Sequence, residues 1–173
     1  MHKLYSAAAL LWLAGAAQAQ SRLAGTEFAS CRPNENGPAL RAEIDGFRDR
    51  KGNVRIELYP PEDADFLTSS KVLIANGKDF RRVEVPVPTA GTVSICIRAP
   101  HVGSYAVSVL HDRKGDGKFA AMSDGAGFGN NPRLGLSKPT AAAATLAIGP
   151  GVTTARIVLN YFRGFSFGPI RGH

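Results

Sequence analysis

The 173-residue sequence lacks an apolar stretch long enough to make a good transmembrane helix. Its longest apolar run, from Leu4 to Ala17, follows a short basic start and is rich in alanine. Ala17-Gln18-Ala19 then supplies the small-x-small pattern after which signal peptidases cut. We therefore predict that residues 1–19 are a signal peptide and that the mature chain is periplasmic or secreted. An uncleaved N-terminal anchor is the alternative.

Cysteine is also scarce, since Cys31 and Cys96 are the two in the chain and neither belongs to a Cys-x-x-Cys pair. This argues against a cysteine-based metal or catalytic site. In an exported protein, two cysteines favour a disulfide between them, which would close a loop of 64 residues. In TVSICIRA, Cys96 lies on the face opposite the apolar residues, so the bond would hold the segment around Cys31 against the outside of a sheet.

Clustered positive charge is missing as well, although the formal net charge is +7. The densest basic group consists of Arg48, Arg50 and Lys51 and is interrupted by Asp49. Without a basic stripe, an aromatic platform or a known motif, the sequence argues against nucleic-acid binding. A basic exported protein can instead meet an envelope protein or an anionic polymer through long-range attraction.

Long apolar stripes at helical spacing are absent, and alternation of apolar and polar residues dominates after residue 38. It predicts strands over residues 40–45, 54–59, 83–88, 92–98, 104–111, 144–148 and 154–162. Prolines make the third an edge strand, and DADFLTSSKVLI has room for one helical turn. The pattern predicts an all-β fold, an antiparallel β-sandwich of about seven strands, each sheet apolar inside and polar outside.

The predicted sandwich domain spans residues 39–162. Before it, residues 20–38 form a polar, turn-rich N-terminal extension, and after it residues 163–173 form a C-terminal tail. Because Phe165 and Phe167 would be unusual in a free tail, we expect part of this tail to pack on the sandwich.

The stretch HDRKGDGKF follows the strand predicted at 104–111 and concentrates charged residues and glycine. Asp112 and Asp116 occupy the first and fifth positions of a calcium loop, with glycine at the sixth. Lys114 stands where an oxygen ligand belongs, and the twelfth position is Ser123, with Asp124 one place late. Calcium binding by Asp112, Asp116 and Asp124 is therefore an alternative rather than the first expectation.

A tight turn is the favoured interpretation of the same stretch. Asp112 and Asp116 are suited to accept hydrogen bonds from nearby backbone amides, and Gly115 and Gly117 can adopt positive φ. Catalysis is the third alternative, with His111 as a base. His111 and Asp112 are adjacent and project to opposite faces of the strand, so they cannot orient one another. Candidate nucleophiles are near only in sequence, and none lies in a Gly-x-Ser-x-Gly motif: Ser104, Ser108 and Ser123.

GSYAVSVLHDRKGDGKF, followed by DGAGFGNNPR, resembles the bacterial family known as domain of unknown function 2141. The residues that carry the resemblance are Gly103, Tyr105, His111, Asp112, Asp116, Gly117, Gly127, Phe128, Asn130 and Asn131. It covers roughly residues 38 to 162 and implies an exported protein with an immunoglobulin-like or transthyretin-like sandwich, but no activity. The chain departs from the family pattern at Lys114 and Ala120, which weakens any cation binding that the loop would imply.

These observations favour an exported, non-enzymatic β-sandwich that serves as a binding or structural accessory of the cell envelope. The first alternative is a calcium-stabilised ligand-binding module using the 112–124 loop, with Asn130 as a further oxygen donor. The second is a hydrolase centred on His111. No cofactor is expected apart from that calcium ion.

Overall fold

The computed structural model describes residues 31, 32, 34 and 36–170. The predicted signal peptide at 1–19 lies outside the described residues. The strands are β1 (Ala39–Asp45), β2 (Asn53–Tyr59), β3 (Arg81–Pro86), β4 (Val93–Arg98), β5 (Gly103–Asp112), β6 (Gly125–Phe128), β7 (Thr145–Ile148), β8 (Val152–Val158), β9 (Asn160–Phe162) and β10 (Phe167–Pro169). A helix, α1 (Ser70–Ala75), and a 3₁₀ turn, η1 (Ala142–Ala144), accompany them. No helix among these residues is long and apolar enough to cross a membrane.

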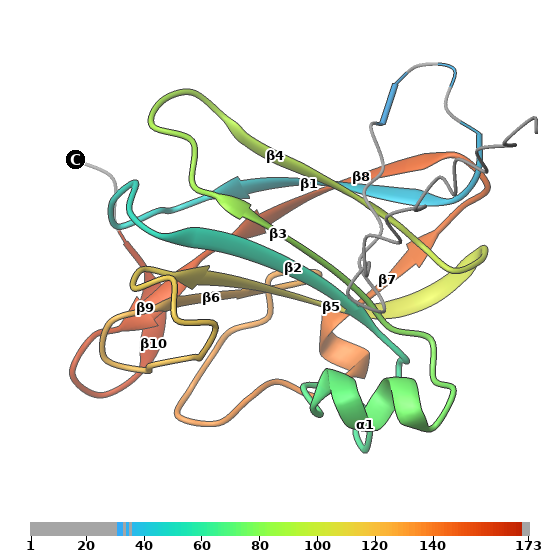
Figure 1. Cartoon of the computed structure of the whole chain (residues 1–173). Coiled ribbons are helices and arrows are strands. Elements are labelled where there is room, and N and C mark those ends of the chain that lie inside the picture. Colours follow the sequence, from blue (N-terminus) through green and yellow to red (C-terminus); the bar gives the residue numbers. More distant parts are fainter. Residues whose placement is uncertain (1–30, 33, 35, 171–173) are drawn as a thin grey trace, which may run out of the picture.

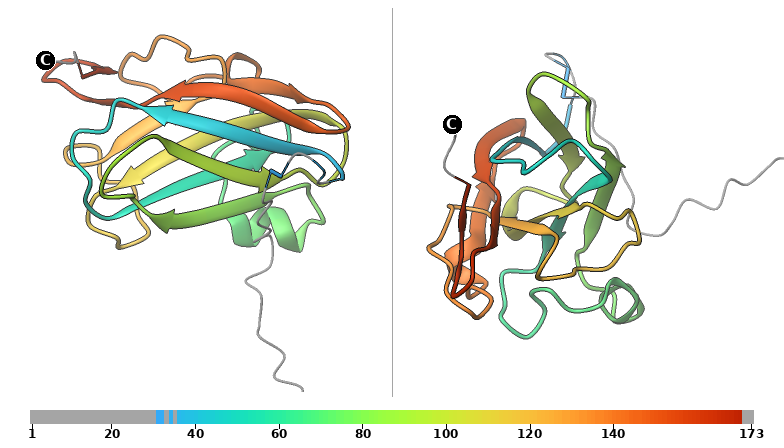
Figure 2. Two further views of the ribbon diagram at one scale, coloured as in Figure 1. Left: turned by 90° about the horizontal axis from the view of Figure 1, so that it is seen from above. Right: turned by 90° about the vertical axis from the view of Figure 1, so that its left-hand side faces the viewer.

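The strands form two sheets packed face to face, which confirms the predicted sandwich. One sheet has three strands in the order β4-β1-β8, and the other has seven, in the order β10-β9-β6-β5-β2-β3 with β7 also paired to β5. In Figure 1 the three-stranded sheet lies above the larger one, and α1 lies below both. The end-on view in Figure 2 shows the two layers. All seven predicted strands are present, and β6 and β10 are additional.

The main core fills the space between the sheets and follows the alternation read from the sequence. On β1, Leu40, Ala42 and Ile44 are buried, and the residues between them are not fully buried. Val54, Ile56 and Leu58 of β2 face them from the other sheet within the same cluster. Burying one such side chain stabilises the fold by about 1.5–3 kcal/mol.

The segment predicted as one strand at 154–162 is in fact two strands. β8 pairs with β1 in the smaller sheet, whereas β9 pairs with β6 in the larger one. The break falls at Leu159, which is fully buried and whose N–H donates to the Asp45 carbonyl at 2.9 Å. The chain thus changes sheets at one residue and closes one side of the sandwich. A further difference is that β8 runs parallel to β1, while the other strand pairs among the described residues are antiparallel.

Cys31 and Cys96 form the expected disulfide, with their Cα atoms 5.9 Å apart. Cys96 lies on β4 and packs with Ala39 and Val152 in a small cluster outside the main core. The Cys31 carbonyl also accepts a hydrogen bond from Arg41. The segment before β1 is therefore fixed to the outer side of the three-stranded sheet.

The outer face of the seven-stranded sheet differs from the expected polar surface. A second apolar cluster covers the end of this face near α1 and consists of Tyr59, Phe66, Leu73, Phe80, Ala106, Phe128, Ala141 and Ala144. Residues 60–80, which include the expected helical turn, and residues 129–144 pass over the sheet and supply most of these side chains. The outward positions of β2 are buried as a result.

Candidate functional site

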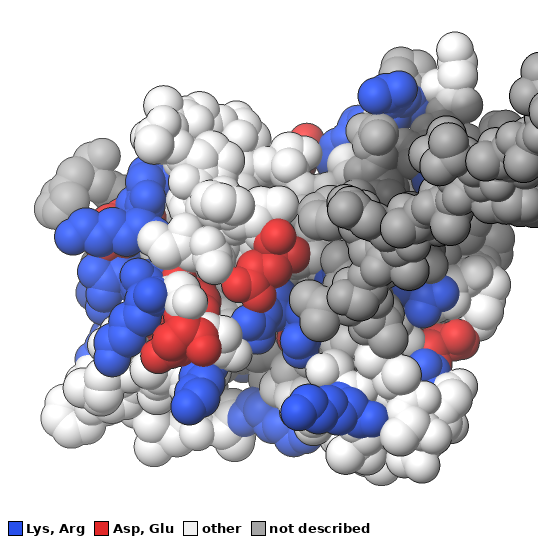
Figure 3. All heavy atoms as spheres, in the orientation of Figure 1, with Lys and Arg blue, Asp and Glu red and all other residues white. Residues whose placement is uncertain are grey.

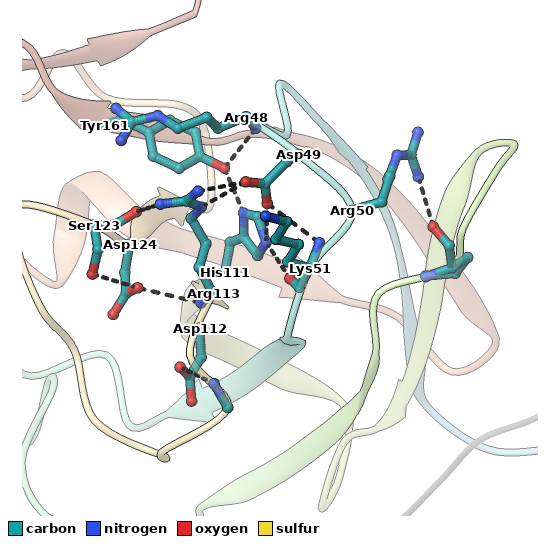
Figure 4. A network of polar contacts seen from close by, with 12 residues as sticks. Arg48, Asp49, Arg50, Lys51, His111, Asp112, Arg113, Ser123, Asp124 and Tyr161 are labelled. Atoms are coloured by element: carbon teal, nitrogen blue, oxygen red, sulfur yellow. Dashed lines mark hydrogen bonds and ion pairs between the residues drawn. The ribbon is translucent and has the colours of Figure 1, made fainter.

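One end of the sandwich, where the β1–β2 loop meets the end of β5 and β9, contains His111, the predicted base; it is named the loop end below. His111 is fully buried at the end of β5. Its Nε2 lies 2.8 Å from the Lys51 carbonyl, and its Nδ1 lies 2.6 Å from the Tyr161 hydroxyl. A carbonyl can only accept, so Nε2 carries the proton and the Tyr161 hydroxyl donates to Nδ1. That hydroxyl accepts the Arg48 N–H at 3.0 Å (Figure 4).

This network joins three segments that are distant in the sequence. Burial lowers the pKa of His111, which keeps the ring neutral, and burial raises the pKa of Tyr161 to about 12. Asp49 lies beside them and binds the Arg113 guanidinium, whose Nε is 3.0 Å from Oδ2; this hydrogen bond lowers the pKa of Asp49. The β1–β2 loop is thereby attached to β5 and β9 by groups that satisfy one another.

Asp112 organises the turn that follows. Its carboxylate oxygens accept the N–H groups of Gly115 at 2.8 Å, Asp116 at 3.4 Å and Gly117 at 2.7 Å. Gly115 and Gly117 have φ values of 68° and 76°, a region in which a β-carbon is unfavourable. Asp116 is exposed and accepts the Lys118 N–H at 2.9 Å. The stretch has the geometry of the tight turn expected from its residues.

The predicted calcium ligands lie in one loop, but the carboxylates of all three already accept backbone N–H groups. Asp124 is buried and accepts the Ala120 N–H at 2.8 Å and the Arg113 N–H at 3.2 Å. Asn130 lies beyond β6, where its side-chain amide donates to the Thr145 carbonyl. Among residues 31, 32, 34 and 36–170, no group of three or more acidic, histidine or cysteine side chains is arranged to hold a metal ion.

The predicted nucleophiles are not brought to His111. Ser108 faces the opposite side of the sheet, where its hydroxyl lies 3.3 Å from Glu57, and Ser123 donates to Asp124. Ser104 is exposed and lines a shallow depression beside His101. Both ring nitrogens of His111 have other partners, so no base–nucleophile pair forms from these residues.

A groove of about 490 Å³ lies on the outer face of the seven-stranded sheet, where the alternation of residues predicted a plain polar surface. Its floor comes from β2, β3, β5 and β6, and its walls come from residues 67–70, residues 134–139, Phe119 and Phe167. The volume falls within the range of about 300–1,000 Å³ that is typical of small-ligand sites.

A buried carboxylate stands at the centre of the groove floor. Glu57 is only 7% exposed and accepts hydrogen bonds from Tyr59 at 2.6 Å, Ser108 at 3.3 Å and Arg82 at 2.6 Å. Burial, followed by the charge of Glu57, raises the pKa of Tyr59, so the phenol stays protonated and donates. Because this carboxylate has a cation and two hydroxyls, its burial is compensated.

Arg55 occupies the next outward position of β2 and is 8% exposed. Its Nε lies 2.6 Å from Glu84 on β3, and its Nη2 donates to the Gly117 carbonyl at 3.2 Å. The turn organised by Asp112 is thus joined to the groove floor, which places Phe119 at that end of the groove.

Apolar side chains form the rim, and three of them are unusually exposed. Leu67, Phe119 and Leu136 are 38%, 52% and 77% exposed, and all three line the groove. The wall that carries Leu136 has no regular secondary structure but is anchored at both sides. Lys138 donates to the Phe66 carbonyl at 2.9 Å, and the Gly135 carbonyl accepts a backbone hydrogen bond.

Sequence reasoning missed the groove because the alternation in β2 places Arg55, Glu57 and Tyr59 on the outer face of a sheet, which is expected to be polar and solvated. Two signals were available. One is the placement of three large hydrogen-bonding side chains at successive outward positions of one strand. The other is the pair Leu134 and Leu136 in a segment rich in glycine, proline and serine.

A family model described as "Uncharacterized protein conserved in bacteria (DUF2141)" matches residues 42–156. The chain belongs to this family. The match covers most of the sandwich, including His111, Asp112 and the groove floor, and ends before Tyr161. Neither the curated proteins nor the solved structures gave a match.

Several residues of the motif by which the chain resembles the DUF2141 family hold the loop end together. Beside that motif, a β-carbon on Gly125 would lie 2.5 Å from the Tyr161 ring; within it, one on Gly127 would lie 2.7 Å from Ile157. Asn131 adopts a positive φ of 49° and uses its side chain to bind the backbone of Arg156 and Val158. These contacts give the motif a structural role.

Proposed function

We propose that this protein is an exported, non-enzymatic binding protein of the cell envelope, periplasmic or secreted, and that its groove holds a small ligand. The observation that carries the proposal is the groove itself. It combines a compensated polar floor around Glu57 with an exposed apolar rim. Exposed apolar side chains that gather around one concave site are typical of ligand-binding surfaces.

The hydrogen bonding of the floor supports binding rather than chemistry. Glu57 is held by Tyr59, Ser108 and Arg82, so its carboxylate serves as a fixed acceptor. Fixed polar groups orient a ligand, and the apolar walls supply affinity through burial. The predicted signal peptide and the disulfide support the assignment to the envelope.

A neutral fluorescent probe, N-phenyl-1-naphthylamine, tests the groove directly. We expect saturable binding of one probe per oxidised mature chain. The variant Leu136→Ser should weaken it about tenfold, because one leucine side chain loses its burial against the probe. Val102→Ser is the matched control, since Val102 is 55% exposed but does not line the groove. Unsaturable binding, or equal effects of the two substitutions, would refute the groove as a binding site.

Cell fractionation with thiol labelling tests the location. We expect the protein outside the cytoplasm with Cys31 and Cys96 unreactive until a reductant is added. A cytoplasmic protein whose thiols react at once would contradict the envelope assignment.

A further inference from the structure

We propose that the ligand of the groove is a single-chain amphiphile with a carboxylate head group, with its head at Lys138 and its alkyl chain extending toward Phe119. This inference rests on the proposed function, because it names the class of ligand for the same groove. Three features support it: one end of the groove is polar and the other apolar, the lining has one surplus positive charge, and the wall at the apolar end is aromatic.

The groove has a polar end beside α1. Tyr59 of β2 marks this end of the floor, and the hydroxyl-bearing residues Thr68, Ser69, Ser70 and Ser137 line it. Lys138 lines the groove together with these residues, and its Nζ lies 2.9 Å from the Phe66 carbonyl, two residues before Thr68. A fixed cation among hydroxyls suits an anionic head group, because hydrogen bonds to ions are about twice as strong as neutral ones.

The opposite end of the groove is apolar. Arg55 marks this end of β2, but its guanidinium is already bound to Glu84 and to a backbone carbonyl. The wall there is aromatic, with the rings of Phe119 and Phe167 6.1 Å apart. Leu110 lines the floor beside them, directly across from Arg55 in the strand register. An alkyl chain fits such a wall, because its burial is favourable and needs no hydrogen-bond partner.

Of the three cations that line the groove, one has no carboxylate partner within the described part of the chain. Arg82 is paired with Glu57, and Arg55 is paired with Glu84. The third cation that lines the groove is Lys138, and its contact is to a neutral carbonyl. The surplus is a single positive charge, which matches a carboxylate rather than a phosphate monoester, whose charge at neutral pH is about −1.5 to −2. On the face of the molecule shown in Figure 3, by contrast, acidic groups lie between the basic ones.

The test is displacement of the neutral probe from the oxidised mature protein by four ligands of equal chain length, below their micelle concentrations. They are tetradecanoate, tetradecanol, tetradecyl phosphate and tetradecyltrimethylammonium. We expect tetradecanoate to bind about tenfold more tightly than the alcohol or the phosphate, and the cationic ligand to bind least. Affinity should also rise about fourfold for each methylene added between decanoate and tetradecanoate, because each is buried.

The variant Lys138→Met tests how much the ligand's carboxylate head group contributes to affinity. It should weaken tetradecanoate binding about tenfold, the loss of one hydrogen bond to a charged group, and leave tetradecanol unchanged. Lys138→Arg keeps the charge and should retain the preference. Lys114→Met is the matched control, because it removes an exposed lysine that does not line the groove.

The possible failures are distinguishable. If the probe and the alcohol bind but the carboxylate has no advantage, the head-group inference is wrong and the groove remains a ligand site. Tighter binding of the phosphate would overturn the assignment of a single charge. If neither the probe nor any amphiphile binds the folded protein, the proposed function fails together with this inference.

Discussion

Replacing Tyr161 by Phe removes one oxygen atom from the loop-end network. It should lower the free energy of unfolding more than a change from Tyr to Phe usually does. The hydroxyl donates to His111 Nδ1 at 2.6 Å and accepts the Arg48 N–H at 3.0 Å. Phenylalanine fills the same space, so the core packing is retained. The substitution leaves a fully buried ring nitrogen without a donor and a backbone N–H without its acceptor.

The magnitude follows from those two orphaned groups. A buried polar group left unsatisfied costs about 1–3 kcal/mol. The ring nitrogen of His111 has no access to water, whereas the Arg48 N–H is only partly buried. We therefore expect Tyr161→Phe to lower the free energy of unfolding by about 2–4 kcal/mol, or the Tm by roughly 5–15 °C for a domain of this size.

Tyr105→Phe is the matched control. Its hydroxyl also donates one hydrogen bond and accepts one, to the carbonyl and from the N–H of His101. His101 is exposed, so water can replace the lost oxygen and the cost should stay below about 1 kcal/mol. Urea unfolding followed by circular dichroism measures both variants. Equal losses in the two, or a loss below about 0.5 kcal/mol for Tyr161→Phe, would refute the deduced hydrogen-bond directions and their energetic weight.

Four further outcomes are expected. Burial lowers the pKa of His111 below its ordinary 6.5, so as the pH falls the unfolded chain takes up this proton before the folded protein does. The free energy of unfolding should therefore be unaffected by His111 above about pH 6.5 and should decrease as the pH falls below that value. In urea titrations, His111→Gln should show a flatter decline of stability toward low pH. Replacing Cys31 and Cys96 by Ala should cost about 4 kcal/mol in the same assay, because the bond closes a loop across 65 positions. Asp112→Ala should cost about 2–4 kcal/mol, since three backbone N–H groups lose their acceptor. Wild-type melts in EDTA and in millimolar calcium should coincide, and a calcium-dependent rise of about 5 °C or more would restore the metal-loop alternative.

The strands that the sequence predicted are those with apolar residues at alternate positions. β6 escaped prediction because its sequence, GAGF, has low strand propensity. Its glycines are needed for another reason, since Gly125 lies against the Tyr161 ring and Gly127 against Ile157. The division between β8 and β9 was also hidden, because Leu159 continues the alternation while the chain changes sheets.

The candidate site was predictable only in part. The position of His111 at the core side of a strand end and the capping role of Asp112 follow from local alternation and turn chemistry. The groove depends on which segments cover the outer face, and residues 134–139 reach it only through tertiary contacts. Alternation tells which residues share a face, but not whether that face meets solvent.

The parallel pairing of β1 with β8 has a consequence for the order in which the chain can fold. Ala39 pairs with Val152, 113 residues further along the chain, whereas the β4 partner of β1 and the disulfide cysteine Cys96 arrive much earlier. A chain that emerges from its N-terminus can therefore build and crosslink two strands of the smaller sheet while the other edge of β1 is still open. Open strand edges pair readily with other chains. A truncation before Val152 would leave that edge permanently exposed and should produce a protein that is oxidised, partly folded and prone to self-association.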